Sequence, residues 1–167
     1  MTSLLGLAQA MALALAVQAA PQNGAQPPAE RPQAATPARS TRASEGWTWT
    51  LYSGDGPLVL ANEIPDTPRL RTTLECAPGS SVVRLAFHDA PGADGFAVIR
   101  SGAASAEVEA RARRGRLEAT LRADHPVFAA FLASGRLTLS LSDQTKAVEI
   151  DRANLSKLRR FAELCTG

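Results

Sequence analysis

The stretch 104–121, ASAEVEARARRGRLEATL, decides the fold class of this chain. Small or apolar residues occupy every second position of 104–112 and of 117–121, and most positions between them are polar or charged. Such alternation places the two sets of side chains on opposite faces of β-strands. Arg114-Gly115, between the two runs, is typical of a tight turn. The segment therefore predicts an antiparallel hairpin with one face toward the core and one toward solvent.

The same period of two recurs on both sides of this hairpin, which makes strands the dominant element of the chain. Turn-forming residues such as Pro78-Gly79 and Pro91-Gly92 separate the apolar runs. Further strands are predicted over 47–52, 58–60, 70–76, 83–87, 96–98, 137–141 and 148–150.

Two segments depart from the alternation and predict short helices. Asp124-His125-Pro126 is typical of a capped helix start, and Gly135 of a helix end. Within residues 151–165, apolar side chains recur every three or four positions. We therefore expect a mainly β fold, an antiparallel sheet or β-sandwich of seven to nine strands, with two short helices of which the last is C-terminal.

Two tryptophans, Trp47 and Trp49, share one face of the first predicted strand. Exposed aromatic rings there could form a platform for sugars. Their alternation with Thr48 and Thr50 favours the other interpretation, in which both rings point into the core, where large aromatic side chains contribute most.

The first 19 residues predict the cellular location. An alanine- and leucine-rich apolar run ends at Val17-Gln18-Ala19, which has the small or modest side chains of a signal-peptidase site. The run is too short and too interrupted for a membrane span, which needs about 20 continuous apolar residues. We expect residues 1–19 to be a signal peptide, and the mature chain to be periplasmic or secreted in a Gram-negative bacterium without a membrane span.

Residues 20–44 are rich in proline, alanine and glutamine and contain no aromatic residue and no Leu, Ile or Val. Such a composition cannot bury enough apolar surface to fold, so it predicts a disordered tether. Residues 45–167 then form a single β-rich domain of common size. This domain has as many acidic as basic residues, which gives no global charge for binding nucleic acid.

Two cysteines, Cys76 and Cys165, are the only ones in the chain. In an oxidising compartment an even number of cysteines is usually paired, and two allow only one intramolecular bridge. Metal binding is the alternative, but the long separation and the lack of a CxxC spacing argue against it. We expect a disulfide.

No catalytic, cofactor or metal motif is present, so we assign no catalytic residue, no metal ligand and no cofactor. His88 lies beside Asp89 and near Asp94, and a histidine with an acidic partner could serve a small hydrolase. No second histidine stands close enough to complete a metal-ligand set. His125 is explained by its place in the first turn of a predicted helix.

The arginine-rich tip of the 104–121 hairpin is the least ordinary surface feature of the sequence. Arg111, Arg113, Arg114 and Arg116 fall within six positions, and guanidinium groups match the geometry of phosphate and carboxylate. The four side chains form a possible anion-binding site. Glutamates at 109 and 118 could instead neutralise them and leave a solvated edge.

Four short segments carry a resemblance to known proteins: Trp47-x-Trp49, Leu74-Glu75-Cys76, the strand start at 134–137 (SGRL) and the C-terminal stretch 161–165 (FAELC). This layout resembles exported proteins of alphaproteobacteria without assigned function, and the invasion-associated locus B type of periplasmic protein. The resemblance implies a two-cysteine periplasmic β-rich domain with no known catalysis, and it transfers no functional residue.

Two hypotheses of different classes follow from these observations. The first is a non-enzymatic envelope binding or interaction module, whose partner is an acidic envelope polymer or another envelope protein. The second is a small periplasmic hydrolase that uses His88 with an acidic partner. Convergence of His88 with Asp89 or Asp94 in a cleft would distinguish them.

Overall fold

The structure is a computed structural model that describes residues 46–88 and 90–167. All of these residues belong to one compact unit, Thr41–Gly167. The predicted signal peptide and the predicted tether lie outside the described residues.

The domain is built on one antiparallel sheet of nine strands, whose spatial order is β1-β2-β3-β4-β7-β6-β5-β8-β9. Every neighbouring pair of strands is antiparallel. Two helices accompany the sheet, the second at the C-terminus, so the predicted mainly β class is confirmed. The elements are β1 (Thr48–Tyr52), β2 (Leu58–Glu63), β3 (Leu70–Cys76), β4 (Val82–Phe87), β5 (Gly95–Ser101), β6 (Ala104–Arg113), β7 (Arg116–Arg122), α1 (Pro126–Ser134), β8 (Arg136–Leu141), β9 (Gln144–Glu149) and α2 (Leu155–Thr166).

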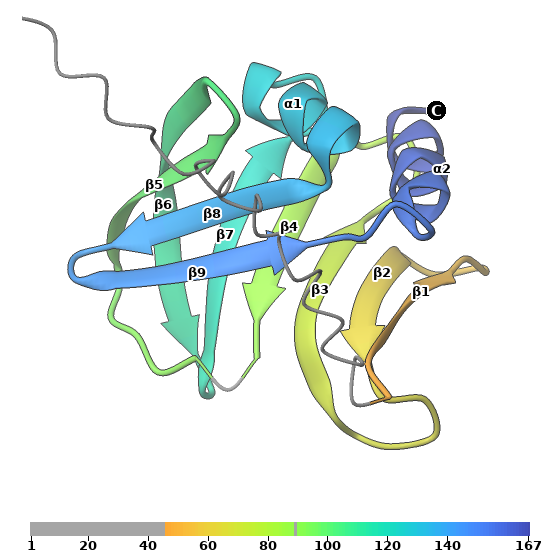
Figure 1. The fold of residues 1–167 in the computed structure, drawn as a ribbon, viewed down its shortest axis with the longest axis horizontal. Helices are drawn as coiled ribbons and strands as arrows, with labels where there is room; N and C mark the ends of the chain where they lie inside the picture. Colours follow the sequence, from red (N-terminus) through yellow and green to blue (C-terminus); the bar gives the residue numbers. More distant parts are fainter. Residues whose placement is uncertain (1–45, 89) are drawn as a thin grey trace, which may run out of the picture. The chain divides into compact units, whose positions relative to one another are not determined.

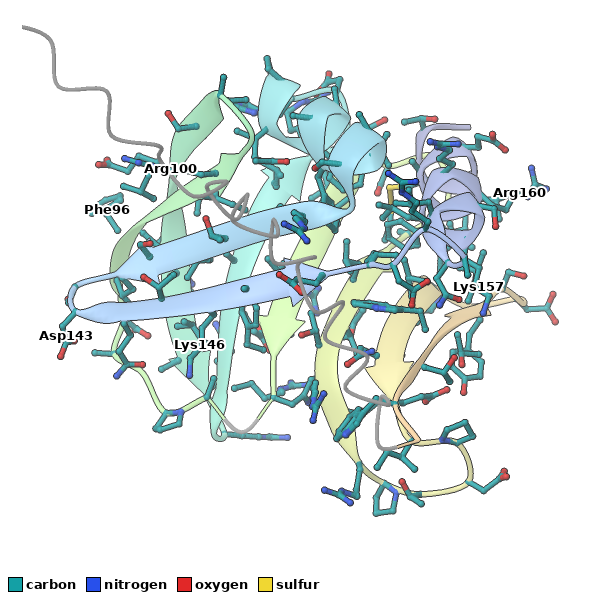
Figure 2. All side chains as sticks on the ribbon, in the orientation of Figure 1. Phe96, Arg100, Asp143, Lys146, Lys157 and Arg160 are labelled. Carbon is teal, nitrogen blue, oxygen red and sulfur yellow. A yellow bond between two sulfur atoms is a disulfide. The ribbon has the colours of Figure 1, made fainter. Side chains whose placement is uncertain are left out.

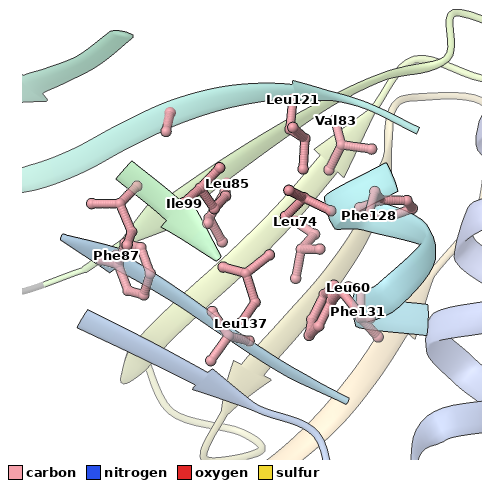
Figure 3. Close-up of a cluster of buried hydrophobic side chains, with 14 of the residues drawn as sticks. Leu60, Leu74, Val83, Leu85, Phe87, Ile99, Leu121, Phe128, Phe131 and Leu137 are labelled. Carbon is pink, nitrogen blue, oxygen red and sulfur yellow. The ribbon is translucent and has the colours of Figure 1, made fainter. Parts of the chain in front are cut away.

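The sheet curls so that its inner face encloses the hydrophobic core (Figure 1). Cross-strand register builds this core in rows, because Leu60 lies opposite Leu74 and Leu74 opposite Leu85. Leu137 of β8 reaches the same cluster from the far side of the curl, as Figure 3 shows. Each fully buried side chain of this size stabilises the fold by about 1.5–3 kcal/mol, so the core is the main reason why the sheet keeps its curl.

Helix α1 closes part of the core with Phe128 and Phe131, whose rings make an edge contact (Figure 3). The helix begins after His125, whose Nδ1 accepts the backbone N–H of Val127 at 3.1 Å. The cap is therefore the imidazole, and Asp124, which also precedes the helix, forms an ion pair with Arg122 instead. The Asp124 carboxylate pairs with Arg122 and does not cap the helix, because the two side chains form a strong bidentate contact.

A side-chain hydrogen bond joins the two edge strands of the sheet, β1 and β9. A second one joins β1 to α2. Trp49 of β1 is buried and donates its indole N–H to the carbonyl of Glu149 at 3.1 Å. Lys157 of α2 donates to the carbonyl of Trp49 at 2.6 Å (Figure 2). Trp49 thus packs in the core as predicted. Trp47 does not, since it precedes β1, is half-buried and lies 3.9 Å from the guanidinium of Arg71.

The predicted disulfide is present and joins the end of β3 to α2. Cys76 and Cys165 have a Cα–Cα distance of 5.7 Å, which suits a disulfide, and both residues are buried. Backbone hydrogen bonds reinforce the junction, because the N–H of Ser81 binds the carbonyl of Cys165 at 3.0 Å. Among the described residues, no helix has the length and apolar character that a membrane span requires.

Candidate functional site

The arginine-rich hairpin is formed as predicted, with β6 and β7 paired and a two-residue turn between them. Arg113 lies opposite Arg116, so Arg114 and Gly115 make the turn. Both turn residues have positive φ, 49° and 77°, as a turn that matches the twist of the strands requires. The pairing brings two arginines directly across from each other, an arrangement that costs electrostatic energy unless an anion offsets it.

A groove lies on the outer face of the sheet beside this hairpin and has a volume of about 770 Å³. Its lining includes five arginines, four from the hairpin and one from β4. We call it the arginine groove and define it by Arg84, Arg111, Arg113, Arg114 and Arg116.

The register explains why Arg84 joins the hairpin arginines, although it lies far from them in the sequence. Strand β4 is hydrogen-bonded to β7, and Arg84 lies opposite Thr120, another lining residue. Residues opposite each other in an antiparallel pair project from the same face. Alternation along the chain does not predict this neighbour, because strand order is not visible in such a pattern.

Carboxylates neutralise three of the five arginines. Arg111 contacts Glu109 through two hydrogen bonds of 3.0 and 3.1 Å, and Arg116 lies 3.1 Å from Glu118. Arg84 is 3.6 Å from a third carboxylate, that of Glu75 on β3. The pairs of Glu109 and Glu118 are those that the alternative interpretation of the tip, a solvated edge, requires.

Arg113 and Arg114 are not neutralised in this way. No carboxylate of the described residues comes within ion-pair distance of either guanidinium. Both residues are exposed, and the groove they line has five arginines against only two glutamates. The groove therefore keeps an excess of positive charge at the hairpin tip.

The chemistry of this groove is that of anion binding. A guanidinium presents several N–H groups in one plane, which match two oxygens of a phosphate or carboxylate. The hydroxyl of Thr120 adds a neutral donor at the groove wall. A ligand with several negative charges would meet Arg113 and Arg114 first.

His88 lies elsewhere, at a smaller cavity of about 390 Å³ between β9 and the ends of β3 and β4. Its Nε2 is 3.2 Å from the hydroxyl of Thr73. The Asp94 carboxylate accepts the backbone N–H of Ala112 at 2.8 Å. Asp89 lies outside the described residues. The structure thus places His88 and Asp94 in separate hydrogen bonds.

No group of three or more His, Cys, Asp and Glu side chains within 46–88 and 90–167 is arranged to hold a metal ion. Comparison of the chain with protein-family models, with curated proteins and with solved structures finds no significant match.

Proposed function

We propose that this protein is an exported, non-enzymatic binding module of the cell envelope that holds an acidic envelope polymer in the arginine groove. The observation that carries the proposal is the pair Arg113 and Arg114, two exposed guanidinium groups without a carboxylate partner among the described residues. They line a groove whose remaining arginines are already oriented by ion pairs.

The disulfide between Cys76 and Cys165 supports an extracytoplasmic location, because disulfides persist mainly in oxidising compartments. The apolar run over residues 1–19 of the sequence supports the same location. An acidic polymer is preferred as ligand over a single small anion because the groove is large and its cations come from three strands.

Replacement of both unpaired arginines tests the proposal. We expect R113Q/R114Q to reduce the affinity for inorganic tripolyphosphate at least tenfold, since a hydrogen bond to a charged group contributes about 1.5–3 kcal/mol. Isothermal calorimetry on the exported chain at low and at high salt measures this. Retention on isolated envelope fractions, assayed with the same variant, then connects the anion site to an envelope polymer.

The matched control is R152Q/R159Q, which removes the same charge from two exposed residues, one before α2 and one within it. This control should bind within twofold of the parent, and both double variants should melt at the parent temperature. Equal tripolyphosphate binding by R113Q/R114Q and the parent would show that the arginines are only a solvated edge. Binding that ignores salt would also contradict an electrostatic site.

A further inference from the structure

The outer face of the sheet is also hollowed beside the arginine groove. A second hollow of about 390 Å³ on the same outer face shares two lining residues with it, Arg84 and Thr120. The two hollows therefore meet at Arg84 and Thr120, and we treat them together as one depression over β4 and β7. The part of β7 that lines it runs from Arg116 to Thr120, and four steps of about 3.3 Å give a length of about 13 Å along this strand.

The character of the lining changes along this depression. Beyond the ion pair between Arg84 and Glu75, the lining is formed mainly by Pro57, Ala77 and Val82, with the Cys76 end of the disulfide and one hydroxyl residue, Ser80. We call this part the apolar end. The two residues of that ion pair are the only charged residues that line it. A polyanion would therefore gain no binding free energy from this part of the depression.

One large exposed hydrophobic side chain lies at the apolar end. Only three such side chains are found in the described residues, Tyr52, Val82 and Phe96. Val82 lines the apolar end and is 41% exposed. Tyr52 lies opposite Val59, which lies opposite Glu75, so it shares the outer face with the depression without lining it. Isolated exposed hydrophobic residues are ordinary, so the apolar lining as a whole, rather than Val82 alone, favours contact with an apolar ligand.

From this change of lining we infer that the groove binds an anionic amphiphile, with its acidic headgroup among Arg111, Arg113 and Arg114 and its alkyl chain on Pro57 and Val82. The inference rests on the proposed function, because the same arginines hold the headgroup. It narrows the acidic envelope polymer of the proposed function to one that carries a hydrocarbon chain beside a phosphate-type group.

Alkyl phosphates of increasing length, used below the concentration at which they form micelles, test the inference on the exported chain. Full burial of one CH₂ strengthens binding about fourfold, and an open groove covers about half of it, which gives about twofold per CH₂. We expect octyl phosphate to bind at least tenfold more tightly than butyl phosphate. Octyltrimethylammonium, with the same chain and the opposite charge, should not bind.

Two single variants locate the alkyl chain. V82S should remove most of the gain from butyl to octyl phosphate and leave butyl phosphate binding unchanged. F96S is the matched control, because Phe96 is 73% exposed on β5 and lies away from the apolar end (Figure 2). The gain in affinity from butyl to octyl phosphate should be the same for F96S as for the parent. Thermal melting of both variants checks that the fold is retained.

The possible results separate this inference from the proposed function. Binding of tripolyphosphate and butyl phosphate without any gain for octyl phosphate would overturn the amphiphile and leave the anion site. If F96S removed the gain in affinity from butyl to octyl phosphate and V82S kept it, the assignment of the apolar end would be overturned. Failure of every anionic probe to bind would overturn both proposals.

Discussion

At the scale of single residues, the most specific contact on the outer face is between Tyr52 and Glu63. The phenolic O–H of Tyr52 donates to the Glu63 carboxylate at 2.5 Å. This hydrogen bond raises the pKa of Tyr52, with burial and the negative charge of Glu63 as smaller causes in the same direction. Loss of the proton would place a phenolate against a carboxylate, which explains the direction of the pKa shift.

We predict that E63Q lowers the pKa of Tyr52 toward the usual tyrosine value, since the amide cannot repel a phenolate. Tyr52 is the only tyrosine of the chain, so titration of tyrosinate absorbance reports on it alone. E75Q, which removes a carboxylate that makes its ion pair with Arg84, is the control and should leave the titration unchanged. An unchanged pKa in E63Q would show that the hydrogen bond does not form in solution.

At the scale of elements, the end of α1 depends on one glycine. Gly135 has φ 70° and donates its N–H to the carbonyl of Phe131 at 2.8 Å, which closes the last turn. Its own carbonyl accepts the N–H of Ile150 at 2.8 Å, so the residue also links the helix to the segment after β9. A side chain at this position would collide with the backbone of Ile150 and with Leu155.

We predict that G135A lowers the free energy of unfolding by more than about 2 kcal/mol. The left-handed conformation alone costs an alanine about 1–2 kcal/mol, and the collision with a backbone oxygen adds to it. Urea denaturation measures the loss. G56A is the control, because a Cβ there meets nothing within 4 Å and the backbone is not left-handed. A loss for G135A no larger than for G56A would contradict the role given to the turn.

At the scale of the whole molecule, the disulfide joins two parts of the chain that are 89 residues apart. It fastens α2 beside β2 and β1, the strands at one edge of the sheet. Leu158 and Phe161 of α2 are fully buried in the core. The bridge therefore restrains both the last element of the chain and the edge of the sheet that it covers.

We predict that the double variant C76S/C165S is less stable than the parent by about 2–5 kcal/mol, mainly because the unfolded chain regains the freedom of a long loop. Calorimetric melting measures this difference, and a reducing agent should lower the melting temperature of the parent only. Hydrogen exchange should show α2 losing protection before β4 and β7. Equal melting of oxidised and reduced parent would contradict a stabilising bridge.

Part of the site follows from the sequence for a local reason. Alternation over 104–121 predicts which arginines point outward and where the turn falls, since both depend on neighbouring residues. The contribution of Arg84 cannot be predicted in this way, because β4 and β7 are paired across more than 30 positions of the sequence. The ion pairs within the hairpin are local, because Arg111 and Arg116 each pair with a glutamate two positions away on the same strand.

Local patterns predict the strands, the two helices and the pairing of the two cysteines, because period, turn residues and caps act over a few neighbouring positions. The strand order and the cap on α1 by His125 are visible only in the folded chain. The tertiary structure also placed the apolar end beside the arginine groove. These features arise from contacts between segments far apart in the chain, where register and packing outweigh local pattern.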